Sequence, residues 1–284
     1  MKHIALATSE AYKSLTADDK LLLAPLAMHG IQAAPAIWSD EKFPWASMDA
    51  VVLRSCWDYH LRLPEFLRWL SRMEDQKLRV WNPPALMRWN ADKIYLRDLE
   101  AKGVAVIPTI WPDAAIRLDE TMGNLGWEQA IVKPRVSATA HKTCLTSASD
   151  TVLAQPILDE LVAGPGALVQ KFMPEIQAEG EWSLVFFAGR FSHAVVKTPK
   201  PGDFRVQHDF GGLERSAEPP VYVLEDATQV MKAVGEPTLY ARVDGVESAG
   251  RLYLMELELI EPALFLNSMP SAPDRFAKTI ASLL

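Results

Sequence analysis

The sequence is poor in cysteine and lacks long apolar runs. Only Cys56 and Cys144 are present, without Cys-x-x-Cys spacing, so a disulfide framework or a zinc site has little support. No run reaches the roughly 18 apolar residues that a transmembrane helix requires. The apolar stretch after Met1 is too short for a secretory signal. We therefore expect a cytoplasmic protein with no membrane partner.

Basic residues are also fewer than acidic residues. The formal net charge is -7, and no stripe of basic residues is evident. Nucleic acids and anionic membranes attract clustered positive charge, so neither is an expected partner. Hydrophobic residues make up 49% of the 284 positions, which is enough for a sizeable core and suggests about two domains. This composition favours a soluble enzyme with more than one lobe.

Strands and helices alternate at the start of the chain. The expected elements are strands at 4–7, 32–37, 50–54 and 80–81, with helices at 20–29 and 64–73. Such alternation predicts a parallel sheet. The segment Asn82–Pro84 interrupts the pattern, because proline lacks an N–H donor and restricts the residue before it. This segment is a candidate domain boundary.

Antiparallel sheets are expected in the rest of the chain. A helix is predicted from Asn90 to Lys102, ending at Gly103. Strand candidates follow at 130–133, 167–172, 182–187 and 191–196. The second half therefore has the pattern of an α+β fold.

Acidic residues interrupt two apolar strands, 240–244 and 254–260. Because side chains alternate along a strand, Glu256 and Glu258 share one face, and so do Arg242 and Asp244. Carboxylates together with substrate phosphates typically hold magnesium, so these acids indicate a nucleotide-dependent enzyme. The alternative is an edge hairpin whose acids point into water.

The register of this hairpin decides whether the two charged faces coincide. A one-residue slip reverses the face of every side chain on a strand. A four-residue loop at 247–250 would pair Asp244 with Tyr253 and turn it away from Glu256. We therefore expect a three-residue connection, a five-residue connection or a β-bulge.

Two lysines are placed to bind phosphate. Lys133 ends an apolar strand, and Lys93 lies in the predicted helix that opens near Trp89. For Lys93 the alternative is a solvated helix face. The segment 135–141 has mostly short side chains and would form a cover over a phosphate chain.

A third segment has the character of an adenine pocket. The apolar strand 168–173 ends at Pro174 and is followed by Glu175 and the polar run 177–181. Its edge would hydrogen-bond an adenine, and a following acid would bind ribose hydroxyls. The alternative is an ordinary core strand with an exposed acidic turn.

The order of these segments resembles the ATP-grasp superfamily, in the branch of glutathione synthetase and RimK-like ligases. The resemblance covers about residues 89 to 262 and rests on Asn90–Lys93, Ile131–Pro134, Val169–Pro174, Gly180–Glu181, Arg242–Asp244 and Glu256–Glu258. A narrower resemblance rests on 53–60, 204–212 and 258–266. These segments are similar to the cyclo-ligases of cycloserine biosynthesis, which close O-ureido-D-serine into a ring using ATP.

The resemblance implies an ATP-grasp fold of mixed α/β and α+β class. An N-terminal parallel-sheet domain would span 1–88 on the substrate side. A central lobe at 89–173 and a C-terminal lobe at 174–284, which carries the metal site, would clasp ATP.

The resemblance also implies roles for individual residues. The nucleotide would be bound at its phosphates by Lys93 and Lys133, at adenine by Gln170, Lys171, Phe172 and Met173, and at ribose by Glu175 or Glu181. One or two Mg²⁺ ions, with Mn²⁺ as an alternative, would be bound by Asp244, Glu256 and Glu258. Arg242 and Arg205 would neutralise the transferred phosphoryl group.

The implied reaction is ATP-dependent ligation of a carboxylate to an amine through an acyl phosphate. The substrate would be small and amino-acid-like, and the ligation would be intramolecular or would join two substrates. A non-catalytic nucleotide-binding module and a kinase that stops at phosphorylation remain alternatives, and a homodimer stays open.

The chain departs from the family pattern at two places. Glu258 stands where the family pattern Glu-x-Asn has asparagine, which adds negative charge to the metal site. The phosphate-covering loop is commonly rich in glycine, yet 136–140 contains none, so its closure would be stiffer.

Substrate-binding residues are expected just after the strand at 50–54. Ligands of open α/β sheets bind beyond the carboxyl ends of the strands. Arg54 would bind a carboxylate and Asp58 an ammonium, with Tyr59 beside them. The alternative is that Trp57 and Tyr59 pack while Arg54 and Asp58 pair locally. The polar segment 205–212 has the character of a substrate lid.

Overall fold

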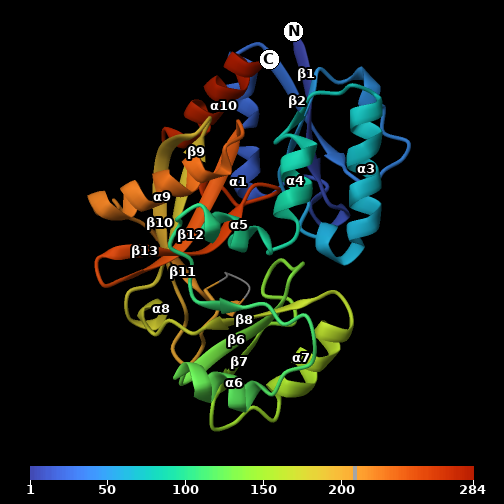
Figure 1. The fold of residues 1–284 in the computed structure, drawn as a ribbon. Coiled ribbons are helices and arrows are strands. Elements are labelled where there is room, and N and C mark those ends of the chain that lie inside the picture. Colours follow the sequence, from blue (N-terminus) through green and yellow to red (C-terminus); the bar gives the residue numbers. More distant parts are fainter. Residues whose placement is uncertain (207–209) are drawn as a thin grey trace.

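Three sheets make up the fold, each formed by one region of the chain (Figure 1). The computed structural model describes residues 1–206 and 210–284. Each sheet takes its strands from one of the three predicted domain ranges, and the boundaries themselves stay a prediction. Within the described residues, no helix has the length and apolar composition needed to span a bilayer.

The first sheet is parallel, as predicted, with strand order β2-β1-β3-β4. Its strands are β1 (Lys2–Thr8), β2 (Ile31–Ile37), β3 (Ala50–Leu53) and β4 (Val80–Trp81). The neighbouring α-helices are α1 (Ala17–Lys20), α2 (Leu23–Met28), α3 (Leu63–Asp75) and α4 (Pro84–Asn90), and short 3-10 turns lie at η1 (Glu10–Tyr12), η2 (Trp45–Ser47) and η3 (Tyr59–Arg62). Every residue of β3 is buried, as expected for a strand covered on both faces.

The second sheet is antiparallel and has a core of its own. Its strands are β5 (Thr109–Ile110), β6 (Gln129–Pro134), β7 (Cys144–Ser147) and β8 (Ala167–Lys171), in the order β5-β8-β6-β7. The helices α6 (Leu118–Leu125) and α7 (Ala154–Ala163) supply Met122 and Leu158, which pack against Val132 and Val169 of the sheet. This lobe forms the lower part of Figure 1.

The third sheet is antiparallel, with strand order β11-β10-β9-β12-β13. Its strands are β9 (Glu181–Phe187), β10 (Arg190–Thr198), β11 (Leu213–Ser216), β12 (Tyr240–Ser248) and β13 (Arg251–Glu258). The accompanying helices are α5 (Tyr95–Ala101), α8 (Glu175–Ala178), α9 (Val221–Val234), η5 (Leu266–Ser268) and α10 (Ala272–Leu283).

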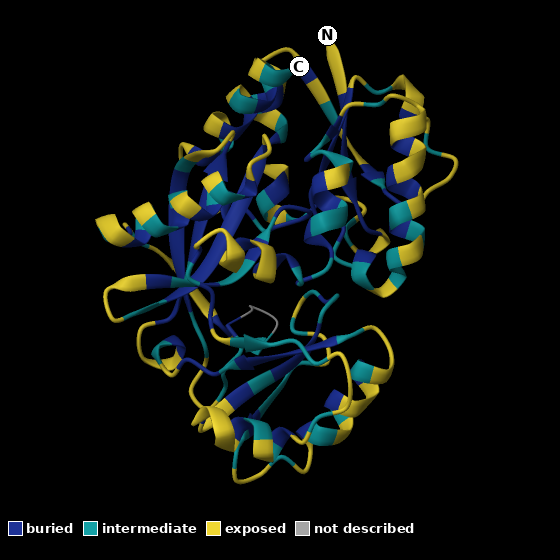
Figure 2. Cartoon of the chain, in the orientation of Figure 1, coloured by how far each residue is buried: buried dark blue, intermediate teal, exposed yellow. Residues whose placement is uncertain are grey.

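The first and third sheets share a hydrophobic core. Phe276 of α10 and Val185 of β9 belong to the same buried cluster as Leu6 of β1 and Leu26 of α2. Figure 2 shows the buried strands lying inside a shell of helices whose outer faces are exposed. The N-terminal and C-terminal regions are therefore packed together, which fixes the side of the site that they form.

The helix predicted from Asn90 to Lys102 is wrong in its extent. α4 ends at Asn90 and α5 begins at Tyr95. The Asn90 amide donates to the carbonyl of Leu257 (2.8 Å) and accepts from the N–H of Leu259 (2.9 Å). The Tyr95 hydroxyl accepts from the N–H of Leu257 (2.9 Å). Asn90 and Tyr95 thus satisfy backbone groups on the outer edge of β13. The helix is interrupted between these two residues, where these tertiary hydrogen bonds form in place of continuous helical ones.

Asn82 joins the first sheet to the third, and we expect its replacement by alanine to destabilise the protein by about 3 kcal/mol. Its amide donates to the carbonyls of Tyr240 (2.9 Å) and Leu259 (2.7 Å) and accepts from the N–H of Leu239 (2.7 Å). The side chain is fully buried, so the loss leaves three backbone groups without partners. Urea denaturation measures the change.

Asn124→Ala is the matched control for this measurement, because Asn124 is exposed on α6. Its free energy of unfolding should stay within about 0.5 kcal/mol of the wild-type value. An equally small change in Asn82→Ala would show that these three hydrogen bonds add little to stability.

Candidate active site

The β12–β13 hairpin carries the predicted acids and contains a β-bulge. Its two-residue turn, Ala249–Gly250, has positive φ at both positions (51° and 75°), as a tight hairpin turn requires. The ladder is regular from this turn to the pair Gly245–Leu254. Met255 is an extra residue without a partner on β12, so the next pair is Asp244 opposite Glu256. The predicted bulge is confirmed, although the connection is shorter than the predicted three or five residues.

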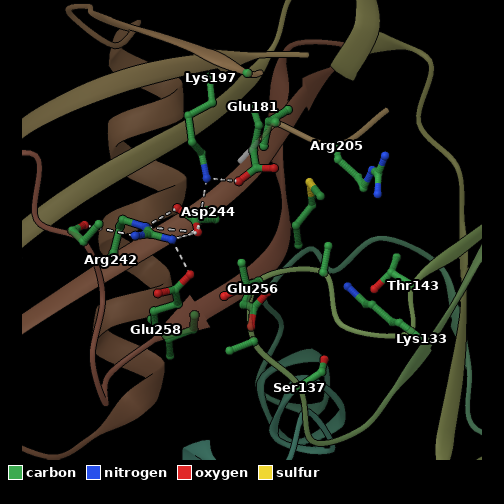
Figure 3. A pocket seen from close by; sticks show the side chains of 18 of the residues that line it. Lys133, Ser137, Thr143, Glu181, Lys197, Arg205, Arg242, Asp244, Glu256 and Glu258 are labelled. Carbon is green, nitrogen blue, oxygen red and sulfur yellow. Dashed lines mark hydrogen bonds and ion pairs between the residues drawn. The ribbon is translucent and has the colours of Figure 1, made fainter. Parts of the chain in front are cut away.

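The bulge also places Arg242 opposite Glu258, so four charged side chains project from one face (Figure 3). Arg242 donates from Nε and Nη2 to the Asp244 carboxylate (2.9 and 2.8 Å), and Nη2 also donates to Glu258. Ser183 also donates to Asp244 Oδ1 (2.6 Å). The acids are therefore held by a buried guanidinium and do not point into bulk water.

Burial and neighbouring charge shift the pKa values of Asp244 and Glu258 in opposite directions. Burial would raise the pKa of Asp244, but Arg242 and Lys197 lower it to about 2. Burial raises the pKa of Glu258 to about 7, although Arg242 opposes this shift. Asp244 is the more strongly ionised of the two at neutral pH.

Lys133 approaches the acids from β6, and Lys93 approaches them from the segment between α4 and α5. Lys93 Nζ lies 2.9 Å from Glu256 Oε1 and donates to the carbonyl of Ser137 (2.8 Å). Its exposed fraction is 5%, so the solvated helix face considered for Lys93 is wrong. Lys133 donates to Gln170 Oε1 (3.1 Å), and burial lowers its pKa to about 8. Both ammonium groups are thus available at one end of the site.

Lys197 is a third basic residue of the site and was not predicted from the sequence. Its Nζ lies 2.5 Å from Glu181 Oε1 and 3.7 Å from Asp244 Oδ2. Burial raises the pKa of Glu181. A signal was present, because Lys197 lies near the end of the apolar strand β10 just as Lys133 lies near the end of β6.

These side chains line a single cavity of about 330 Å³, a volume typical of small-molecule sites. The predicted site residues that line it are Tyr59, Lys93, Lys133, Gln170, Phe172, Glu181, Arg205, Arg242, Asp244, Glu256 and Glu258. The aromatic residues that the predictions did not include are Tyr12, Trp57, Phe204 and Phe265. The cavity therefore brings the basic and acidic sets together beside an aromatic wall.

The loop after Lys133 contributes to the lining without any glycine. Ser137, Thr139 and Thr143 all face the cavity. Thr139, Ala140 and Lys142 have φ near 52°, in the left-handed region that glycine adopts most easily. The loop thus reaches the site as the sequence suggested, and its stiffer closure stays a prediction.

Three predicted nucleotide contacts do not line the cavity. Side chains alternate along β8, so Lys171 points away from the cavity that Gln170 faces. Met173 packs in a small apolar cluster with Ile176. Glu175 accepts a hydrogen bond from Ser248 (2.5 Å), which leaves Glu181 as the acid at the cavity.

Arg54 and Asp58, which were expected to contact substrate, do not line the cavity. Arg54 is 1% exposed and donates to Asp19 (2.8 Å) and to the carbonyl of Pro262 (2.8 Å). Asp58 accepts from the Trp38 indole (2.8 Å) and pairs with a nearby arginine. Both residues pair locally, as the alternative described. Direct contact of either residue with substrate stays a prediction.

Arg205 lines the cavity but is held by a neighbour. Its Nε and Nη2 donate to the Asp203 carboxylate (3.0 and 2.8 Å), which lowers the pKa of Asp203. The guanidinium also lies over the ring of Phe210, 3.8 Å from the ring centre. Positions 207–209 of the expected lid lie outside the described residues.

The donor chemistry of the three acids suits Mg²⁺, which prefers carboxylate oxygens. Within the part of the chain that the structure describes, no three His, Cys, Asp or Glu side chains form a ready-made metal cage. Mg²⁺ is usually held by one or two carboxylates plus substrate phosphates, so such a cage is not required. The metal roles of Asp244, Glu256 and Glu258 stay a prediction.

The fold matches solved structures of ATP-grasp ligases over nearly the whole chain. A RimK-domain ATP-grasp protein from Sphaerobacter thermophilus matches with a TM-score of 0.72 at 16% identity, covering 99% of this chain and 98% of that one. D-alanine-D-alanine ligase from Bacillus anthracis matches with a TM-score of 0.71 at 16% identity, covering 99% and 97%. The predicted ATP-grasp fold is confirmed.

A narrower similarity defines the family. Residues 4–82 match the model of the N-terminal domain of D-cycloserine synthetase DcsG. The cycloserine biosynthesis protein DcsG of Streptomyces lavendulae is 30% identical over 303 residues, with 99% of this chain and 98% of that protein covered. The crystal structure of D-cycloserine synthetase DcsG matches with a TM-score of 0.90 at 28% identity, covering 99% of both chains. This chain belongs to the DcsG family, and it is an ATP-dependent ligase.

Proposed function

We propose that this chain is a magnesium-dependent carboxylate-amine ligase that cyclises a small amino-acid-like substrate of the O-ureido-D-serine type. The observation that carries the proposal is the single cavity in which Lys93 and Lys133 meet the acidic face of the β12–β13 hairpin. The similarity to a cycloserine synthetase supports ring closure as the reaction.

The cavity offers a distinct set of contacts to each part of the nucleotide. Lys93 and Lys133 would bind the phosphates, Gln170 and Phe172 would contact adenine, and Glu181 would bind ribose. The acids of the hairpin would bind Mg²⁺, which supplies neutralisation of phosphate charge when bound. Catalysis would rest mainly on positioning and charge stabilisation.

The proposed chemistry has two balanced steps. A substrate carboxylate oxygen attacks the γ-phosphorus of ATP, and ADP leaves. A nitrogen of the same substrate then attacks the acyl carbon and loses a proton, and phosphate leaves with that carboxylate oxygen and takes up the proton. Arg242, which lines the cavity, would neutralise the charge on the phosphoryl group during both steps.

An isotope experiment tests this sequence. O-ureido-D-serine labelled with ¹⁸O in its carboxylate is incubated with ATP and Mg²⁺, and the released phosphate is analysed by mass spectrometry. The proposal expects ADP together with phosphate that carries one ¹⁸O atom. Release of AMP, or phosphate without label, would refute the acyl-phosphate route, and turnover that requires a second amine would favour a two-substrate ligase.

We expect nucleotide affinity to weaken as the pH rises through about 8. Burial lowers the pKa of Lys133 to about 8, so this ammonium is charged below that pH and increasingly neutral above it. Phosphate binds the charged form, so the dissociation constant of ADP should rise toward tenfold per pH unit between about pH 8.5 and 9.5. Isothermal titration calorimetry measures it.

Lys133→Arg provides the comparison, because a guanidinium keeps its charge throughout this range. Its dissociation constant should vary much less between pH 8 and 9.5, even if its affinity is lower overall. The same pH dependence in both proteins would assign the titration to another group.

A further inference from the structure

Three residues beyond Glu258, a carboxyl group lines the cavity without a partner. Glu261 is 7% exposed, and no side chain among residues 1–206 and 210–284 donates a hydrogen bond to its carboxyl group or forms an ion pair with it. The acids Glu181, Asp244, Glu256 and Glu258, by contrast, all have basic partners. Burial raises the pKa of Glu261 well above its usual value, because a buried carboxylate without a partner is costly. A ligand cation would supply the missing partner and favour the charged form.

The neighbours of Glu261 fit an organic cation. Its backbone carbonyl accepts a hydrogen bond from the Trp57 indole (2.9 Å), and the Tyr12 ring packs edge-on against Trp57 with 4.7 Å between ring centres. Burial and then the nearby Glu261 raise the pKa of Tyr59, whose hydroxyl has no hydrogen-bond partner in the described chain. All three aromatic residues line the cavity, and aromatic faces together with a carboxylate bind ammonium groups well.

Glu261 belongs to a short segment that contacts Arg242 at both of its ends. Arg242 donates to the carbonyl of Ala263 (3.0 Å) and to the Glu258 carboxylate. Both ends of the segment 258–263, which carries Glu261, therefore contact this arginine. In an α-amino acid the ammonium and the carboxylate are attached to the same carbon. A carboxylate that meets the phosphoryl group beside Arg242 would therefore bring its ammonium close to Glu261.

We infer that Glu261 binds the α-ammonium of the substrate, with Tyr59 and Trp57 beside it, and so selects substrates that have a free amine. This inference rests on the proposed function. Ring closure of O-ureido-D-serine uses the ureido nitrogen bonded to oxygen, so the α-ammonium takes no part in the new bond. Glu261 thus takes the role that the sequence suggested for Asp58.

The test removes the charge from Glu261 and the amine from the ligand, separately and together. The ligands are O-ureido-D-serine and its deamino analogue, 3-(ureidooxy)propanoate. Binding to the full chain with ADP and Mg²⁺ is measured by calorimetry for wild type, Glu261→Gln and Glu261→Asp. Glu225→Gln is the matched control, because Glu225 is exposed on α9.

Wild type and Glu225→Gln should bind the amine about 100-fold more tightly than the deamino analogue, the loss typical of removing one partner of a desolvated charge pair. In Glu261→Gln the two ligands should differ by less than about 5-fold, with unchanged ADP affinity, and Glu261→Asp should be intermediate. Retained discrimination in Glu261→Gln, or an equal loss for both ligands, would overturn the inference. A lower Mg²⁺ affinity in Glu261→Gln would make Glu261 a metal ligand instead.

Wild-type turnover separates this inference from the proposed function. If O-ureido-D-serine supports no ADP release, the proposed function fails, and the same comparison is made with D-alanine and propanoate and with D-serine and 3-hydroxypropanoate. Discrimination that Glu261→Gln abolishes in either pair would sustain the role of Glu261. Absence of amine discrimination by wild type in every pair would overturn it.

Discussion

Replacing Glu256 with glutamine should lower turnover by about 10³-fold while the protein stays folded. The change keeps the size of the side chain and removes one negative charge from the face that carries Asp244. Lys93 would lose its ion pair with Glu256 but keep its hydrogen bond to the carbonyl of Ser137. The proposed metal would lose a ligand, so the ADP formed with O-ureido-D-serine should fall without loss of the thermal unfolding transition.

Glu247→Gln is the control for this variant. Glu247 lies on the same hairpin near its turn, where it accepts a hydrogen bond from Tyr222 and does not line the cavity. Its turnover should stay close to wild type. Full activity of Glu256→Gln, measured at saturating ATP and Mg²⁺, would show that the metal and phosphate assignments of this strand are wrong.

Replacing Arg242 with methionine should destabilise the protein by about 3 to 5 kcal/mol. The guanidinium is buried between Asp244 and Glu258, and its removal would leave a buried and a half-buried carboxylate without this cation. Arg242→Lys should recover part of the stability because it restores the charge, but one ammonium cannot reproduce the paired hydrogen bonds to Asp244. Both variants should lose turnover.

Urea denaturation distinguishes this effect from a general cost of losing an arginine. Arg97→Met, at an exposed position on α5, should change the free energy of unfolding by less than about 0.5 kcal/mol. If Arg242→Met unfolded at the same urea concentration as wild type, the buried pairs would contribute no net stability. The electrostatic account of the acidic face would then need to be replaced.

Strand periodicity predicted much of the site. Counting residues across the β12–β13 turn showed that Asp244 and Glu256 would share a face only with an altered loop or a bulge, and the bulge is present. Lys133 also lies near the end of the apolar strand β6, as predicted, and it is buried there. These inferences succeeded because they depend on local alternation, which tertiary contacts rarely change.

Other residues could not be placed from sequence because distant partners decide their positions. Arg54 follows a strand as a substrate contact would, but Asp19 and the carbonyl of Pro262 hold it in the core. Asn90 gave no signal that it would end a helix to hydrogen-bond β13. Glu261 lies beyond the end of β13, where the alternation of side chains no longer predicts direction.

The covering of the β13 edge by Asn90 and Tyr95 also bears on aggregation. A strand at the edge of a sheet offers unpaired N–H and carbonyl groups to any other extended chain. In this fold the strand that presents Glu256 and Glu258 to the cavity is an edge strand. Asn90 at the end of α4 and Tyr95 at the start of α5 satisfy its backbone groups at Leu257 and Leu259. Loosening the contacts of Asn90 and Tyr95 would therefore expose a surface on which copies of the protein can assemble, and soluble yield would decline along with catalysis.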